Sequence, residues 1–130
     1  TALGLSRENV YYRAPSGQPS APARILWYSS RRDRQVVACS RLVEAVIGEP
    51  DALHREFKHL GVWKRSQVRA AARGGRVGAI RFTDTELLPH PVTLEWIRGL
   101  SDEGARLPSQ GPRRISVQLF TEIYRKGRRG

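Results

Sequence analysis

The sequence predicts an α+β fold: a small mixed β barrel with three to four short helices packed around it. The segments Arg24–Ser29 and Gln35–Leu42 are rich in Ile, Leu, Trp, Tyr and Val, and about five polar residues separate them. This pattern is typical of a β-hairpin. A segment with helical spacing of apolar residues, Asp51–Leu60, follows instead of further hairpins. A hairpin followed by a helix indicates mixed α and β structure.

The other elements are expected in chain order. The hairpin's second strand is expected to extend through 43–47, and Asp84 and Glu86 are expected at the solvated end of a later strand. Prolines and glycines mark the loops, and Ser66, Thr93 and Ser116 are suited to cap helices. The expected segments are a strand over 8–13, a loop over 14–23, a helix over 66–72, a strand over 77–83, a helix over 93–100, a polar loop over 101–111 and a helix over 116–125 that ends at Gly127.

The length predicts one domain. The 130 residues are enough for a single core. We expect a flexible segment over 1–8, the domain over 9–125 and a disordered basic tail over 126–130. The sequence contains no methionine, so we expect a fragment of a longer protein, with a catalytic domain linked to it or associated with it. The oligomeric state stays open.

The charge predicts a nucleic-acid partner. Lys and Arg number 23 against 12 Asp and Glu, and the net charge is +11. Nearly all of the excess is arginine, which makes bidentate contacts with phosphate and stacks on aromatic rings. This favours nucleic acid over an acidic protein or a membrane surface. A GC-rich genome is the alternative explanation of the arginine bias.

No motif for metal, cofactor or catalytic chemistry is present. Cys39 is the single cysteine, in an apolar strand where a buried thiol is expected. The three histidines do not match a zinc-binding spacing, and Gly74-Gly75 is too short to cradle a phosphate. No apolar run is long enough to span a membrane and no signal peptide is recognisable, so a cytoplasmic location is expected.

Trp63 is the aromatic residue most suited to bind a base. Most aromatic side chains are buried in cores, but Trp63 lies in a connector beside Lys64 and Arg65. A stacking surface flanked by phosphate contacts is typical of single-strand binding. Arg113 and Arg114 form a second basic cluster, which could hold a phosphate at the helix that begins near Ser116.

The order of elements resembles the PUA-like superfamily of small pseudo-barrels, with its EVE, ASCH and YTH branches, and is most similar to EVE domains. The chain departs from that pattern at Pro22-Ala23, where a Gly-Asp pair is usual, and at Cys39, which stands near a usual glycine. The segments that carry the resemblance are 25–30, 36–43, Pro91-Val92-Thr93-Leu94, Gln110, Arg113–Arg114 and Ser116-Val117.

The resemblance implies a PUA-like domain that binds RNA or DNA and takes a flipped or modified base into an aromatic pocket. A small ASCH-type ribonuclease and a protein-interaction or regulatory module are the alternatives. The pocket candidates are Tyr11, Tyr12, Trp27, Tyr28, Ser29, Ser30 and Trp63. The phosphate-binding candidates are Arg31, Arg32, Arg34, Lys64, Arg65, Arg113, Arg114 and Ser116.

Overall fold

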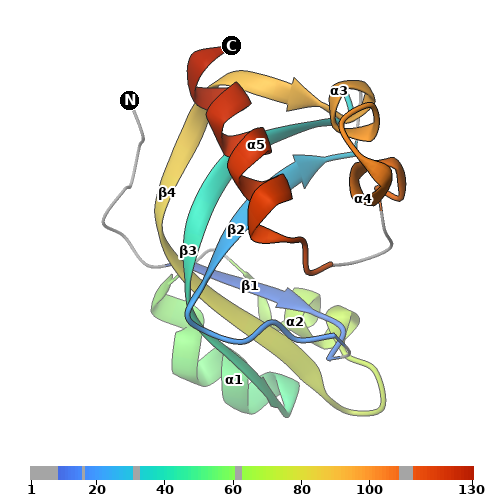
Figure 1. The fold of residues 1–130 in the computed structure, drawn as a ribbon. Helices are drawn as coiled ribbons and strands as arrows, with labels where there is room; N and C mark the ends of the chain where they lie inside the picture. Colours follow the sequence, from blue (N-terminus) through green and yellow to red (C-terminus); the bar gives the residue numbers. More distant parts are fainter. Residues whose placement is uncertain (1–8, 16, 31–32, 61–62, 109–112) are drawn as a thin grey trace. The chain divides into compact units, whose positions relative to one another are not determined.

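The computed structural model describes residues 9–15, 17–30, 33–60, 63–108 and 113–130. Within these ranges the chain forms four strands, five α-helices and one 3₁₀ turn (Figure 1), which confirms the α+β class. The strands are β1 (Asn9–Arg13), β2 (Ala23–Ser29), β3 (Gln35–Gly48) and β4 (Val77–Thr93). The helices are α1 (Pro50–Phe57), η1 (Lys58–Leu60), α2 (Arg65–Ala71), α3 (Leu94–Arg98), α4 (Asp102–Ala105) and α5 (Val117–Arg129).

The strands form one sheet in the order β1-β4-β3-β2, so β1 and β2 lie at its edges. β1 pairs antiparallel with β4, with Tyr11 opposite Ile80 and Tyr12 opposite Ala79. The chain divides into two compact units, and β3 and β4 contribute a segment to each. The α1–α2 unit comprises residues 9–23 and Arg41–Asp84, and the α5 unit comprises Arg24–Ser40 and Thr85–Gly130.

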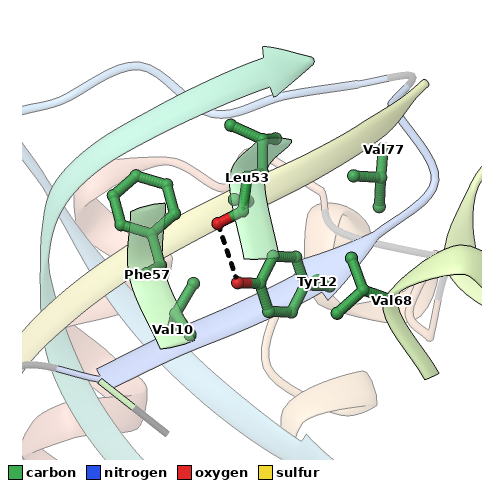
Figure 2. Close-up of a cluster of buried hydrophobic side chains, with 7 residues drawn as sticks. Val10, Tyr12, Leu53, Phe57, Val68 and Val77 are labelled. Carbon is green, nitrogen blue, oxygen red and sulfur yellow. Dashed lines mark hydrogen bonds between the residues drawn. The ribbon is translucent and has the colours of Figure 1, made fainter. Parts of the chain in front are cut away.

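The core of the α1–α2 unit lies between α1, α2 and the strands β1 and β4. Figure 2 shows six of its members converging, and the Tyr12 hydroxyl donates a hydrogen bond of 3.4 Å to the Leu53 carbonyl. Glu49 caps α1 by accepting from the backbone N–H groups of Asp51 and Ala52. The buried cluster consists of Val10, Tyr12, Leu53, Phe57, Val68, Val77 and Ala79.

α2 begins one residue earlier than its expected start, and its cap differs. The sequence predicts Ser66 as the cap, whereas Lys64 occupies the N-cap position. The Lys64 backbone N–H donates to the Gln67 side-chain oxygen at 2.8 Å. The Ser66 prediction was wrong: the N-cap lies two residues before Ser66, and the Gln67 side chain stabilises the first turn by accepting from the backbone N–H of Lys64.

The core of the α5 unit lies under α5. Leu119 and Ile123 of the helix pack on Val36 of β3 and on Leu88 and Val92 of β4. Thr93 caps α3 as expected, because its hydroxyl accepts from the Trp96 backbone N–H at 3.2 Å. α4 lies within the segment expected to be a polar loop.

The second half of β4 corrects the predicted strand end at Thr83. The strand continues to Thr93, so Asp84 and Glu86 lie within it. Asp84 has a φ of 55°, a left-handed conformation that aspartate tolerates better than most residues. Pro89 and Pro91 cannot donate to a strand ladder, so the sequence does not predict a strand over this half.

The C-terminal residues correct the predicted helix end and the predicted disordered tail. α5 continues through Gly127 to Arg129. Gly127 is buried, and a Cβ added there would lie 2.6 Å from Leu88 Cδ1. The glycine is therefore explained by close approach of the helix to β4 and not by a helix stop.

Candidate nucleic-acid interface

Three of the predicted pocket residues come together in the α1–α2 unit. The Trp63 ring meets Tyr11 edge to face, with 5.8 Å between centroids, and meets Tyr12 in a similar way at 5.2 Å. Tyr11 and Tyr12 are neighbours on a strand and point to opposite faces. A ring that contacts both must lie at the edge of the strand, and β1 is an edge strand.

These three rings have different roles. Tyr12 is only 2% exposed and belongs to the core, and burial together with Glu56 raises the pKa of its hydroxyl. Tyr11 is 40% exposed and Trp63 is half-buried. Tyr11 and Trp63 are therefore the rings that a base could contact.

The main-chain position of Trp63 is held from α1. The Trp63 carbonyl lies 2.9 Å from His54 Nε2, which fits a hydrogen bond donated by the imidazole. On the other side of the connector, α2 is tied to α1 by Arg69, whose Nε and Nη2 donate to the two carboxylate oxygens of Asp51 at 2.8 and 2.6 Å. This bidentate pair lowers the pKa of Asp51, chiefly through the hydrogen bonds.

Lys64 and Arg65 are exposed next to this aromatic group. Three other arginines of the unit are paired with carboxylates: Arg41 with Asp84, Arg69 with Asp51 and Arg81 with Glu44. Within the described residues, no ion pair engages Lys64 or Arg65. Arg65 is nevertheless close enough to Asp51 to help lower the pKa of that carboxyl group.

The remaining pocket candidates lie in the α5 unit. Trp27 Nε1 donates to the buried Ser40 hydroxyl at 2.8 Å, and that hydroxyl lies 2.7 Å from Thr85 Oγ1. Tyr28 packs against the α5-unit core. Ser29 is half-buried and Ser30 is exposed. The seven pocket candidates therefore divide between the two units, with Tyr11, Tyr12 and Trp63 in one and Trp27 through Ser30 in the other.

Ser116 already has an anionic partner within the chain. Its backbone N–H and its hydroxyl donate to the Glu103 carboxylate at 2.8 and 2.6 Å, and the hydroxyl oxygen accepts from the Leu119 N–H. The Ser116 donors are thus engaged by Glu103, and the phosphate contact expected at Ser116 stays a prediction. Arg34, Arg113 and Arg114 are exposed, whereas Arg31 and Arg32 lie outside the described residues.

A polar cluster in the α5 unit was missed at the sequence level. Arg24 lies 5.5 Å from the ring centroids of both Phe120 and Tyr124, and its Nη2 donates to Cys39 Sγ at 3.0 Å. Burial raises the pKa of the Cys39 thiol despite the arginine. The residues of this polar cluster are far apart in sequence and follow no motif. They are Arg24, Cys39, Glu86, Phe120, Tyr124 and Arg128.

A carboxylate completes this cluster. Glu86 raises the pKa of Tyr124, chiefly through a hydrogen bond, and its carboxylate lies 3.9 Å from Arg128. Among the described residues, no three His, Cys, Asp or Glu side chains are grouped to hold a metal ion. Nor does any helix of the described ranges have the length and apolar character to cross a membrane.

Solved structures decide the fold. The crystal structure of an ASCH protein from Zymomonas mobilis superposes with a TM-score of 0.72 at 20% identity, covering 92% of this chain and 81% of that chain. The chain has the fold of ASCH domains. Two variants of the same protein, one Ser-to-Ala and one Tyr-to-Phe, give TM-scores of 0.73 and 0.72 at 19% identity, again over 92% of this chain and over 82% and 84% of theirs.

This fold agrees with the fold that the resemblance to the PUA-like superfamily implied. Of the three branches that the sequence resembles, ASCH is the one represented by these structures. No family model and no curated protein sequence matches the chain. At this level of identity the likeness concerns the fold, and function must be argued from the side chains of this chain.

Proposed function

We propose that this chain is a nucleic-acid-binding domain that holds an unpaired base against Trp63 and Tyr11 and the adjoining backbone phosphates with Lys64 and Arg65. The observation that carries the proposal is the contact of Trp63 with the exposed ring of Tyr11, next to two exposed cations, Lys64 and Arg65, that form no ion pair within the described residues. Base stacking on aromatic rings with cations along the backbone is the usual basis of single-strand binding.

The net charge and the fold support the same proposal. A charge of +11 attracts a polyanion over a distance of several ångströms, and the superfamily that the sequence resembles contains RNA-binding domains. A base that stacks on Trp63 must first leave its own stack, which costs a few kcal/mol that stacking and edge contacts recover. An exposed aromatic surface with cations beside it is the arrangement that binding of a flipped base requires.

Substitution of Trp63 tests the proposal. Trp63→Ala is expected to weaken binding of single-stranded RNA or DNA by about 1–3 kcal/mol, or about 5- to 150-fold in Kd, because the stacking surface is lost. The measurement is fluorescence polarisation with a labelled single-stranded oligonucleotide.

Trp63 also contacts Tyr12 of the core, so circular dichroism must show that the variant is folded at the assay temperature. Val117→Ala is the matched control, because Val117 is an apolar side chain exposed by 77% in the other unit. Tyr11→Phe keeps the ring and is expected to keep the affinity. A folded Trp63→Ala variant that binds like the wild type would exclude this surface.

A further inference from the structure

A tight arginine-flanked turn follows α2 in the same unit. Arg73 and Arg76 face each other as an antiparallel bridge, with Arg73 N–H donating to the Arg76 carbonyl at 2.8 Å and the reverse bond at 3.2 Å. Gly74 and Gly75 between them have φ values of 62° and 77°. Positive φ at both central residues is the signature of a type I′ turn, which favours Asn-Gly, Asp-Gly and Gly-Gly.

The turn places two like charges directly opposite each other. Residues that exchange both backbone hydrogen bonds have Cα atoms about 5.5 Å apart, with their side chains on the same face. Like charges in this position destabilise a strand pair. Both arginines are exposed, and no described carboxylate pairs with either. An anion between them would remove the repulsion.

The Arg73 side chain is hydrogen-bonded to the backbone of the preceding residues. Arg73 Nη1 donates to the Ala72 and Ala70 carbonyls at 2.7 and 3.2 Å, at the C-terminal end of α2. Arg73 therefore holds the helix end while its remaining donors stay free. The tip of the turn is open, because a Cβ added at Gly74 or Gly75 would have no atom within 4 Å. The two glycines therefore leave the tip of the turn unobstructed.

We infer that Arg73 and Arg76 form a phosphate-binding fork that serves as a second contact for the nucleic-acid backbone, one helix length away from Trp63. This inference rests on the proposed function. α2 has seven residues and is about 10 Å long at 1.5 Å per residue. Lys64 and Arg65 stand at its start and the fork follows its end. A strand stacked on Trp63 must extend along α2 to reach the fork.

The inference predicts that substitution of the fork affects long ligands and spares short ones. Arg76→Gln removes one cation and leaves the Arg73 bonds to α2 in place. It should weaken binding of a single-stranded octanucleotide several-fold and make the slope of log K against log salt less negative by about 0.7. Binding of a dinucleotide, followed by quenching of tryptophan fluorescence, should be unchanged. Gly74→Asn keeps the type I′ turn and is expected to bind both ligands like the wild type.

The outcomes separate the fork from the proposed function. If the octanucleotide binds Arg76→Gln as tightly as the wild type, the proposed fork is overturned. If Arg76→Gln weakens binding of the octanucleotide and of the dinucleotide equally, the fork is not a second contact. Octanucleotides with and without a 5′-phosphate distinguish the source of the phosphate. If a 5′-phosphate tightens binding to the wild type but not to Arg76→Gln, the fork binds the end of a strand. If the wild type binds octanucleotides with and without the 5′-phosphate equally, the fork binds an internal phosphodiester. Wild-type protein that binds neither ligand overturns the proposed function, and the fork falls with it.

Discussion

Glu103 illustrates at the residue scale how a side chain within the chain can occupy a site expected for a ligand. Hydrogen bonds from the Ser116 hydroxyl and backbone N–H lower its pKa below the ordinary value of 4.5. A carboxyl group whose folded pKa is lowered contributes stability above its unfolded pKa, and that contribution is lost as the pH falls through the folded pKa. Glu103 should therefore contribute fully at neutral pH and progressively less below about pH 4.5.

Glu103→Gln tests this assignment. The amide keeps an acceptor oxygen for Ser116 but does not titrate. Thermal melting between pH 7 and pH 3 should show a smaller loss of melting temperature in Glu103→Gln than in the wild type, and the difference should develop below about pH 4.5. Parallel pH profiles for the two proteins would mean that Glu103 does not stabilise the start of α5.

Single residues also mark the limit of prediction from sequence. The position of Trp63 beside Lys64 and Arg65 predicts a base-stacking residue, and this role stays a prediction. Tyr11 and Tyr12 looked equivalent, because alternation along a strand tells that they face opposite sides but not which side is buried. The structure makes Tyr12 a core residue and leaves Tyr11 exposed. Which hydroxyls and amides already have partners, as for Ser116 and Glu103, depends on contacts across 13 residues of sequence that no local pattern reveals.

At the scale of elements, Gly127 tests the packing of α5 on β4. Replacing a helical glycine by alanine usually gains about 0.5–1 kcal/mol. Here the new Cβ would lie 2.6 Å from Leu88 Cδ1, and overpacking a core costs typically about 1–3 kcal/mol. Gly127→Ala is expected to lower the free energy of unfolding in urea. Leu88→Val makes room for the new Cβ. Gly127→Ala should therefore lower the free energy of unfolding less in the Leu88→Val background than in the wild type. A stabilised single variant would show that the helix end does not pack on Leu88.

Elements with strong periodicity were predicted well. The bounds of β1, β2 and α3 are correct within two residues, and the helix expected over 51–60 corresponds to α1 followed by the 3₁₀ turn η1. The second half of β4 was missed because its prolines disguise a strand that tertiary pairing nonetheless forms. α4 was missed because four residues are too few to show a helical period.

At the scale of the whole molecule, composition carried most of the functional inference. Net charge and arginine content predict the class of partner, and the order of elements predicts the superfamily. The distribution of residues between two compact units is a property of the folded chain. For this reason the sequence analysis assigned to one pocket residues that lie in different units. Arg34, Arg113 and Arg114 stay a prediction as further phosphate contacts.

The polar cluster around Arg24 bears on the ribonuclease alternative. Arginine, tyrosine and carboxylate groups meet there in Arg24, Tyr124 and Glu86. If this cluster cleaved RNA, the ligand would shorten during a binding measurement, and Glu86→Gln would prevent it. Gel analysis of the RNA recovered after each titration therefore separates cleavage from binding in the same experiment.

The salt dependence of nucleic-acid binding tests the central claim most directly. The purified chain would be titrated into labelled single-stranded RNA, single-stranded DNA and duplex DNA over a series of salt concentrations. We expect a single-stranded form to bind best, with log K falling linearly with log salt by about 0.7 for each phosphate neutralised. Lys64→Gln combined with Arg65→Gln should make that slope less steep by an amount that corresponds to about two phosphates, at about 0.7 for each. Absence of binding at low salt, or binding that does not change with salt, would contradict the account.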